Sequence, residues 1–445
     1  MKRNPLSMRK DWVVIADDFT GAGDSAVQFR SEGRPVRLLL NPGAFRSTRQ
    51  RNFAATVVNT DTRFLPAAEA YARVAEMVRH LRDAGARLFY KKIDSTMRGN
   101  PADEIAAVMD AAGYRFAIVA PSAPKNGRIV SGGVCYVGGI PLAETAMGRD
   151  PFTPVSESRV AKIMEKRFSG ESYGLALSAV RGGEATLRAA VEEGLSLGKR
   201  LFVADAETME DLGSIAALVS LDGGLFAGSS GLAEALAKKA SSVPFSLPRV
   251  SKGRVLFVIG SITPTSKIQC ENLVRTGLVS EIVADPPAIL SNPSDEKRRL
   301  LGIVSLVPAG RALLLRTGET ICPADARIPG NAIGSSISAF LGELTLEIVK
   351  LRGIRFLFAS GGDSAARIVA SLGAGSIDLV AELSPGLPFG YFRSKLLGKR
   401  LYFASKAGGF GDPMAMAASL ALVSPASAGL KRHTGAPMEP QEDTK

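Results

Sequence analysis

Short apolar runs alternate with amphipathic segments along most of the chain. In the first 240 residues, runs rich in β-branched and aromatic residues predict strands at Trp12–Ala16, Val36–Leu40, Ala55–Asn59, Leu88–Ile93, Phe116–Ala120 and Leu201–Ala204. Between these runs, Ala67–Leu81 and Glu184–Glu193 carry apolar residues at helical spacing. Strands that alternate with helices predict a mostly parallel sheet with helices on its faces.

A second series of the same kind fills the rest of the chain. Its predicted strands are Arg254–Ile259, Glu281–Val283, Ala312–Arg316, Arg355–Ala359 and Leu401–Ala404. The clearest helix is Ile333–Leu351, whose apolar residues form one stripe that is typical of packing against a core. The fold class is therefore α/β, with two domains that each hold a mostly parallel sheet flanked by helices.

The domain boundaries follow from length and composition. A chain of 445 residues exceeds the size at which one core keeps growing, so two domains are expected. We place the N-terminal domain at 11–240, a linker rich in Ser, Pro and basic residues at 241–253, and the C-terminal domain at 254–428. A polar tail follows at 429–445. Residues 121–155 are rich in Gly and Pro with little periodicity, which predicts a long functional loop.

Composition narrows the function classes. The formal net charge of +12 permits nucleic-acid binding, but the basic residues are spread along the chain and aromatic content is only 6%. Attraction of phosphorylated small molecules explains the charge equally well. Histidine chemistry is disfavoured because only His80 and His433 are present. Three well-separated cysteines, the absence of a secretory signal and the lack of a membrane-spanning apolar run favour a reducing cytoplasm. No nucleic-acid or membrane partner is expected, and a homodimer stays open.

The segment FYKKIDSTMRGN, residues 89–100, concentrates polar chemistry directly after a predicted strand. Positive charge comes from Lys91, Lys92 and Arg98, and further polar contacts are offered by Asp94, Ser95 and Thr96. Open α/β sheets build ligand sites where strands end, and this mixture suits a small anionic polyol. A solvated charge cluster followed by a helix cap at Asn100 and Pro101 is the alternative.

A second polar segment, ADDFTGAGDS at 16–25, follows the first strand. Strand geometry would point Asp17 and Asp18 in different directions, so we expect one to bind a substrate hydroxyl and the other to cap a helix. The glycines predict a tight turn that enters a helix. The substring Gly-Ala-Gly-Asp also invites comparison with ribokinase-type sugar kinases, in which Asp24 would be the catalytic base.

The C-terminal half holds three glycine-rich turns, each placed between a strand and a helix start. They are GSITPTS at 260–266, SGGDSAARI at 360–368 and SKAGGFGDP at 405–413. Glycine allows close backbone approach to a phosphate, and N–H groups at helix N-termini favour anions. Three such turns favour a nucleotide-phosphate site, although neither a Walker A motif nor a G-x-G-x-x-G fingerprint is present.

Over about residues 12–425 the chain resembles the four-carbon acid sugar kinase family, the ATP-dependent kinases of threonate, erythronate and 3-oxo-tetronate. The resemblance rests on motifs in a fixed order: ADDFTGA (16–22), KKIDSTMRGN (91–100), APSAPKNGRIVSGGVCYVGGIPLAET (120–145), DPFTPVSES (150–158), GSSGLAEALA (228–237), GSITPTS (260–266), SGGDSA (360–365), PGLPFG (385–390) and KAGGFGD (406–412). It implies an N-terminal acid-sugar domain, a C-terminal nucleotide domain and an active site in the cleft between them.

The resemblance also implies an ATP site. Its residues are Ser261, Gly361, Gly362, Asp363, Ser364, Gly408 and Gly409. Ser364 stands where the family often has Thr, and Met97 where it usually has Leu. The chain has Gly23-Asp24-Ser25 where relatives commonly have Asn-Asp-Thr/Ser, and the effect of this departure on substrate choice stays open.

The expected reaction is transfer of the ATP γ-phosphoryl group to the terminal hydroxyl of the sugar acid. We expect Lys92 or Arg98 to hold the substrate carboxylate or the transferring phosphoryl group. Asp17 or Asp94 would orient the attacking hydroxyl, with Asp17 preferred because the first strand ends there. Mg²⁺ would be held mainly by ATP oxygens, with Asp363 as a candidate ligand. A ribokinase-like sugar kinase and a non-catalytic sugar-acid or nucleotide-binding protein are the alternatives.

Overall fold

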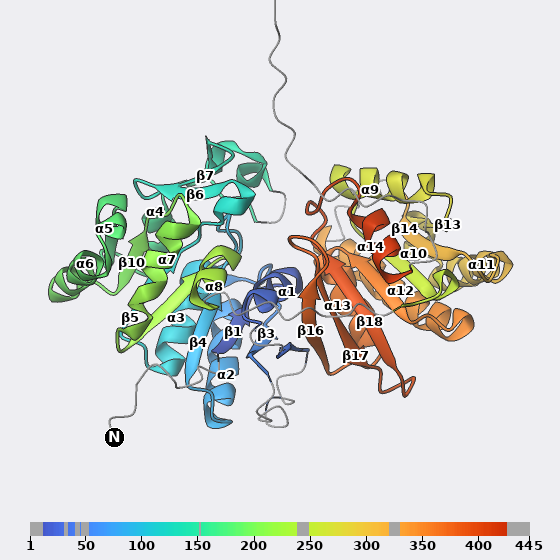
Figure 1. Cartoon of the computed structure of the whole chain (residues 1–445), viewed down its shortest axis with the longest axis horizontal. Coiled ribbons are helices and arrows are strands. Elements are labelled where there is room, and N and C mark those ends of the chain that lie inside the picture. Colours follow the sequence, from blue (N-terminus) through green and yellow to red (C-terminus); the bar gives the residue numbers. More distant parts are fainter. Residues whose placement is uncertain are drawn as a thin grey trace, which may run out of the picture.

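The computed structural model describes residues 12–30, 34–40, 45, 53–150, 153–237, 249–319 and 330–424. It has two α/β halves side by side (Figure 1). We call the N-terminal half, on the left of the figure, the front half and the C-terminal half, on the right, the rear half. A single sheet of 15 strands runs through both, in the order β13-β14-β12-β15-β18-β17-β16-β2-β3-β1-β4-β11-β5-β10-β9. The predicted fold class is thus confirmed, with the addition that the two sheets are continuous.

The front half holds eight strands of this sheet and eight α-helices. Its strands are β1 (Trp12–Ala16), β2 (Val36–Leu39), β3 (Ala55–Asn59), β4 (Leu88–Lys92), β5 (Phe116–Ala120), β9 (Ser172–Leu175), β10 (Leu201–Ala204) and β11 (Gly224–Gly228). Its helices are α1 (Phe19–Gln28), α2 (Ala67–Asp83), α3 (Pro101–Ala112), α4 (Val160–Met164), α5 (Leu177–Arg181), α6 (Glu184–Ser196), α7 (Met209–Ala217) and α8 (Ser230–Ala237). The strands pair with one another in parallel, and β1 and β5 are buried along their whole length because helices cover both faces.

The described part of the rear half has seven strands. They are β12 (Val255–Ile259), β13 (Val279–Ala284), β14 (Ala312–Thr317), β15 (Phe356–Ser360), β16 (Ser376–Glu382), β17 (Pro388–Arg393) and β18 (Arg400–Lys406). Of these, β16, β17 and β18 pair in antiparallel fashion. Its helices are α9 (Pro264–Arg275), α10 (Pro286–Ser291), α11 (Pro293–Leu306), α12 (Gly330–Arg352), α13 (Gly362–Ser371) and α14 (Ala415–Val423). Every strand and helix predicted in either half is present, with ends that differ by up to three residues.

Two predictions about local structure are wrong, and some strands were not predicted. The segment 121–155 is not a structureless loop, because it carries a separate antiparallel sheet of β6 (Arg128–Ser131), β7 (Val134–Val137) and β8 (Ile140–Pro141), which we call the flap. The glycines after Asp18 do not form a tight turn, since α1 begins at Phe19 and contains them. Strands β9, β11, β16 and β17 were not predicted, although β16 is the strand that pairs with the front half.

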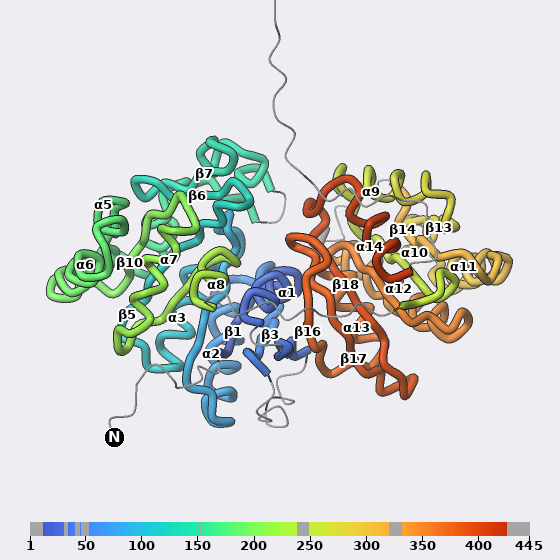
Figure 2. The backbone as a smooth tube through the Cα atoms, in the orientation of Figure 1, coloured from blue at the N-terminus to red at the C-terminus, as the bar shows by residue number. Residues whose placement is uncertain are grey.

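The junction between the halves is an antiparallel pair. Strand β2 of the front half pairs with β16 of the rear half, from Val36 opposite Leu379 to Leu39 opposite Ser376. On this pair the Arg37 guanidinium donates to both carboxylate oxygens of Asp378, at 2.7 and 2.9 Å. Helix α1 lies at the centre of the molecule beside β16 and packs against α13 as well (Figure 2). The relative position of the halves is therefore set by backbone pairing, an ion pair and helix packing together.

Helix α12 is the one described helix that is long and apolar enough to cross a membrane by length and composition alone. Its residues Phe340, Leu341, Leu344 and Ile348 are buried in a hydrophobic core cluster that extends through both halves, and it packs against α10, α11 and α13. The predicted role as a core helix is confirmed.

The junction generates a stability prediction. A Cβ atom on Gly390 in β17 would lie 2.2 Å from the carbonyl oxygen of Asp378 in β16, so Gly390→Ala must push these strands apart. We expect this variant to lose about 1–3 kcal/mol of unfolding free energy in a urea titration. Gly375→Ala is the matched control, because a Cβ at Gly375 meets no atom within 4 Å. Equal stability of the two variants would contradict the tight packing of β16 against β17.

Candidate active site

The polar residues of the front half gather where three neighbouring parallel strands end. Strand β1 lies between β3 and β4, so the residues that follow these strands share one edge of the sheet. Asp17 and Asp18 follow β1, Arg63 lies four residues after β3 ends, and Lys92 is the last residue of β4. We call this group, together with Asp94, the front cluster.

Arg63 is the centre of the front cluster, and it was missed from the sequence. Its Nε and Nη2 atoms donate to the two carboxylate oxygens of Asp17 at 2.7 and 3.0 Å, and Nη2 also lies 2.8 Å from Oδ1 of Asp18. The expected divergence of the two aspartates is therefore wrong, because the strand ends at Ala16. The expected cap is present, since Oδ1 of Asp18 accepts a hydrogen bond from the N–H of Gly21.

Arg63 also sets the charge state of these carboxylates. Burial by itself raises the pKa of Asp17, but the positive charges of Arg63 and Lys91 outweigh burial and hold that pKa below its ordinary value. Burial raises the pKa of Asp18, and the negative charge of Asp17 adds to this effect. Asp17 is thus held as a carboxylate beside a less acidic neighbour.

The two adjacent lysines have different surroundings. Lys91 is fully buried, and its Nζ atom lies 2.7 Å from Oε2 of Glu104. Lys92 has no carboxylate within 4 Å in the described part of the chain, and its Nζ atom donates to the carbonyl of Ile93 at 2.8 Å. That Nζ atom would lie 3.3 Å from a Cβ on Gly21, which places it at the start of α1. Lys91 is therefore committed to the core, whereas Lys92 can bind an anion.

The residues after β4 form a connected polar group. The Asp94 carboxylate accepts hydrogen bonds from Thr96 Oγ1 at 2.5 Å and from Arg98 Nε at 2.7 Å. Arg98 also lies 3.6 Å from Asp150. Burial raises the pKa of Asp94, but Arg63 and Arg98 outweigh it and lower that pKa strongly. Arg98 is largely occupied by Asp94, and Ser95 is half-buried beside this group.

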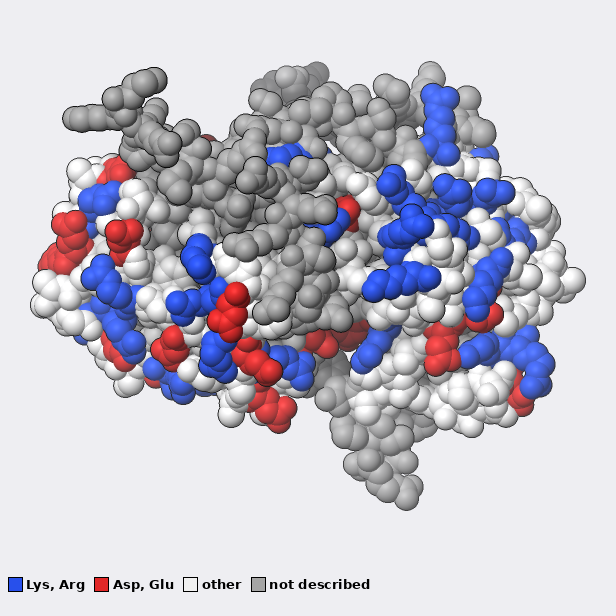
Figure 3. Space-filling model, turned by 90° about the horizontal axis from the view of Figure 1, so that it is seen from below, with Lys and Arg blue, Asp and Glu red and all other residues white. Residues whose placement is uncertain are grey.

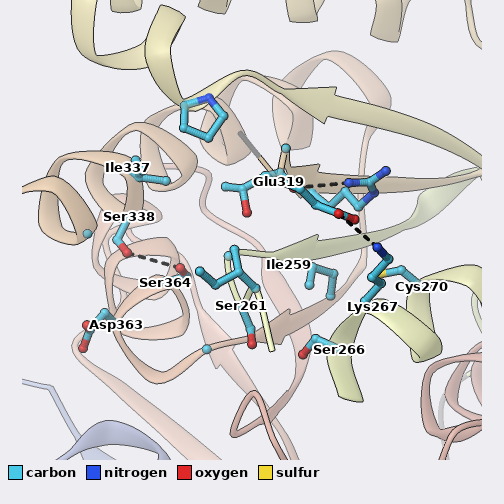
Figure 4. Close-up of a pocket in the computed structure, with 18 of the residues that line it drawn as sticks. Ile259, Ser261, Ser266, Lys267, Cys270, Glu319, Ile337, Ser338, Asp363 and Ser364 are labelled. Carbon is cyan, nitrogen blue, oxygen red and sulfur yellow. Dashed lines mark hydrogen bonds and ion pairs between the residues drawn. The ribbon is translucent and has the colours of Figure 1, made fainter. Parts of the chain in front are cut away.

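The three glycine-rich turns of the rear half also lie side by side, because β12, β15 and β18 are consecutive in the sheet. A cavity of about 680 Å³ opens next to two of them (Figure 4). Its lining includes five of the residues predicted for the ATP site: Ser261, Gly361, Gly362, Asp363 and Ser364. Gly408 and Gly409 do not line it. However, a Cβ on Gly408 would lie 2.2 Å from Ser261 Oγ, so the third turn (405–413) contacts the first turn (260–266) directly.

Lys406 organises the third turn and was not selected as a site residue from the sequence. It is fully buried at the end of β18, and its Nζ atom donates to the carbonyls of Ala407 and Gly408 at 2.9 and 2.8 Å. The same atom lies 3.3 Å from Ser266 Oγ. Burial lowers the pKa of Lys406 to about 8. The lysine therefore fixes the fold of the turn by holding its carbonyls on the inner side.

The front cluster and the glycine turns are close neighbours. A Cβ on Gly362 would lie 2.7 Å from Thr20 Oγ1, so the start of α1 contacts the start of α13. Burial raises the pKa of Asp363, the negative charge of Asp61 adds to this, and Arg63 opposes it. Asp363 of the rear half therefore feels two charges of the front half. Residues separated by about 300 positions in sequence share one electrostatic environment.

Charged side chains of both signs lie on the face of the molecule shown in Figure 3. On the face shown in Figure 3, Lys and Arg side chains lie over both halves and are interspersed with Asp and Glu. They are densest over the rear half. This distribution agrees with attraction of a small anion more than with a continuous track for a polyanion.

Comparisons with known proteins agree across both halves. A family model described as a sugar-binding N-terminal domain matches residues 12–236, and one described as a nucleotide-binding C-terminal domain matches 256–416. The chain is 33% identical to a D-threonate kinase of Salmonella typhimurium, over 90% of this chain and 95% of that protein. It is 29% identical to a D-erythronate kinase of Heliobacterium modesticaldum, with 85% and 89% covered. Identity to a 3-oxo-tetronate kinase of Burkholderia multivorans is 28%, with 89% and 94% covered.

A solved structure from Salmonella typhimurium LT2 has the same fold. It matches with a TM-score of 0.76 at 25% identity and covers 92% of this chain and 98% of its own. Both halves and their junction are therefore included in the match.

The buried lysine generates a pH prediction. Its pKa in the folded chain is about 8, below the ordinary 10.5, so between these values the unfolded chain binds more protons than the folded one. The wild-type unfolding free energy should therefore rise with pH over this window, relative to Lys406→Met, by on the order of 3 kcal/mol in total. Urea titrations from pH 7.5 to 10.5 measure this difference. The exposed Lys395→Met variant is the control and should run parallel to wild type. A constant difference between wild type and Lys406→Met would contradict the assignment.

Proposed function

The chain belongs to the family of four-carbon acid sugar kinases, and from this we propose that it transfers the γ-phosphoryl group of ATP to the terminal hydroxyl of a tetronate. Its curated relatives are kinases of D-threonate, D-erythronate and 3-oxo-tetronate. A phosphotransferase acting on a four-carbon sugar acid is the activity common to these relatives. Threonate, erythronate and 3-oxo-tetronate are the candidate substrates.

The observation that carries this proposal is the contact between the front cluster and the glycine turns. Phosphoryl transfer needs the acceptor hydroxyl in line with the phosphorus atom and needs neutralisation of charge, but little covalent help. Thr20 and Gly362 meet at the junction, and Arg63 acts on Asp363 across it. An acceptor bound at the front cluster and a triphosphate bound at the turns would therefore lie in one cleft between the halves.

We assign the sugar acid to the front cluster. Lys92 is our first choice for the substrate carboxylate, because it is a buried cation without a carboxylate partner in the described residues. Arg98 is weaker for this role since Asp94 occupies it. Asp17 would orient the attacking hydroxyl and accept its proton, with Asp94 as the alternative. Asp18, Ser95 and Thr96 complete the set proposed to bind the sugar acid.

We assign ATP to the cavity of the rear half, and the residues present fit a nucleotide. The N–H groups at the start of α13, from Gly361 to Ser364, face the region where a polyphosphate would lie. Gly361 has a φ of +102°, a conformation that a residue with a side chain rarely adopts. Ile333 and Ile337 of α12 offer an apolar wall for the base. Ser261, Gly408 and Gly409 would border the phosphates from the neighbouring turns.

We propose Mg²⁺ as the cation that accompanies ATP, with Asp363 as its protein ligand. Magnesium is usually held by phosphates and one or two carboxylates. The negative charge of Asp61 adds to the raised pKa of Asp363, and a divalent cation between them would relieve this repulsion. When bound, Mg²⁺ would neutralise charge on the phosphates.

We also propose that the two halves act as the domains expected from the sequence, 11–240 for the sugar acid and 254–428 for the nucleotide. A cytoplasmic location fits the unpaired Cys135 and Cys270.

The ribokinase-like alternative is disfavoured, because Asp24 lies in the second turn of α1 and not at its N-terminus.

The proposal predicts sugar-acid-dependent consumption of ATP. Purified protein with ATP and Mg²⁺ should release ADP when D-threonate, D-erythronate, their epimers or a 3-oxo-tetronate is added, measured by a coupled ADP assay. One of these acids should be preferred over its C2 or C3 epimer by at least about tenfold, because a pocket built for a hydroxyl rejects the wrong configuration. Absence of ADP release with every acid would overturn the proposal.

Asp17→Asn tests the assignment of the hydroxyl-orienting group. The amide keeps the size of the side chain but cannot accept the proton, so kcat should fall by about 100-fold or more while ATP still binds. Asp83→Asn is the control, since Asp83 is an exposed residue at the end of α2. If Asp17→Asn retains turnover and Asp94→Asn loses it, the role passes to Asp94.

A further inference from the structure

Arg128 lies between the two halves without a partner for its charge. It is the first residue of β6 in the flap, and its guanidinium carbon lies 5.5 Å from the ring centroid of Phe410 in the third glycine turn. Its Nε atom is buried and makes no hydrogen bond, and Nη1 reaches the carbonyl of Asn126 only at 3.4 Å. No carboxylate of the described residues lies within ion-pair distance of it. A half-buried guanidinium whose buried Nε atom has no acceptor is destabilising unless a further group binds it.

The backbone around Arg128 is held firmly. Ala123 and Arg128 exchange hydrogen bonds of 2.8 and 3.2 Å, and Gly127 takes the left-handed conformation needed to close this turn. The far end of the flap hairpin is fixed by Asp205, whose carboxylate accepts from the N–H groups of Gly132 and Gly133 at 2.9 and 2.8 Å. Arg128 is thus presented by a supported element of the front half.

Phe410, the aromatic residue of the rear half that lies near Arg128, is also held in position. Phe410 belongs to the turn that contains Gly408, and Gly408 backs onto Ser261 at the cavity. The side chain of Gln269 donates to the carbonyl of Phe410 at 3.1 Å and holds the turn in position. Arg128 is also within electrostatic range of Asp94 in the front cluster. The guanidinium therefore stands between the region assigned to the acceptor and the region assigned to the phosphates.

We propose that Arg128 binds the γ-phosphoryl group of ATP across the junction and stabilises the charge that it carries during transfer. This inference rests on the proposed function. In the reaction, the acceptor hydroxyl oxygen forms a bond to the γ-phosphorus as the bond from that phosphorus to the ADP oxygen breaks, and the hydroxyl proton passes to Asp17. Arg128 forms and breaks no covalent bond. Its planar donors can hold two phosphoryl oxygens at once.

In the absence of a phosphoryl group, the guanidinium makes a cation–π contact with the Phe410 ring. A cation over an aromatic face is stabilised only modestly, so a doubly charged phosphoryl group can displace this contact. A purely structural role would be different: Arg128 would hold the flap on the ring, and removal of either residue would have the same effect.

The test combines turnover with nucleotide binding. Arg128→Gln should lower kcat by about 100-fold or more, while the KM for the tetronate changes little. By calorimetry, it should weaken binding of a non-hydrolysable ATP analogue by about tenfold and leave ADP binding unchanged, because ADP lacks the γ-phosphoryl group. Arg128→Lys keeps the charge without the planar donors and should recover only part of kcat. Arg115→Gln is the control. Arg115 lies just before the amino end of β5, whereas the chain leads into the flap from the carboxyl end of that strand.

Three outcomes would overturn the inference. They are a kcat for Arg128→Gln within about threefold of wild type, equal loss of affinity for the ATP analogue and for ADP, or an equal loss of kcat in Phe410→Leu and Arg128→Gln. If Arg128→Gln does not fold, as judged by its thermal transition, Arg128→Lys supplies the same comparisons. If wild-type protein uses no tetronate, the proposed function fails, whereas the ratio of ATP-analogue to ADP affinity still decides whether Arg128 binds the γ-phosphoryl group.

Discussion

The antiparallel pairing of β2 with β16 is the constraint on which the arrangement of this protein depends. It begins a series of three antiparallel steps, β2-β16-β17-β18, which reverse the strand direction between the halves. In a flat sheet, the functional ends of the two sets of parallel strands would then lie at opposite edges. Six steps separate β1 from β15, and a twist of about 20–25° per step adds up to roughly 120–150°. The twist turns the rear strands back, so that α1 and α13 begin next to each other.

The charged residues at this meeting point differ in whether they have an ion-pair partner within the protein. Lys91 with Glu104, and Arg63 with Asp17, form ion pairs in the interior. Breaking such buried pairs is strongly destabilising, because it leaves an isolated charge out of water. Lys92 in the front cluster and Arg128 in the flap lack carboxylate partners among the described residues. Under the proposed function, the carboxylate of the sugar acid and the γ-phosphoryl group of ATP would supply these two missing anions.

In the rear half the candidate site is formed mainly by backbone turns, whereas in the front half it is formed by charged side chains. Its three turns approach one another so closely that Gly260 and Gly408 have no room for a Cβ atom, since Ser364 Oγ and Ser261 Oγ occupy that space. Lys406 and Gln269 hold the carbonyls of the third turn from behind. Glycine is therefore required at these two positions for packing between the turns, apart from any role in ligand binding.

The sequence by itself determined the α/β class, the positions of most strands and helices, the family and the polar segments of both sites, because periodicity, turn residues and motif order are local properties. It also selected Lys92 and the glycine turns as candidate site residues. The tertiary structure alone showed that Arg63 joins Asp17 to Asp18, that Lys91 belongs to Glu104, and that β16 and β17 fuse the two sheets. Arg128 and Phe410 are 282 positions apart, and no local pattern encodes their contact. Partner choice among charged side chains depends on distances across the fold, which sequence spacing does not fix.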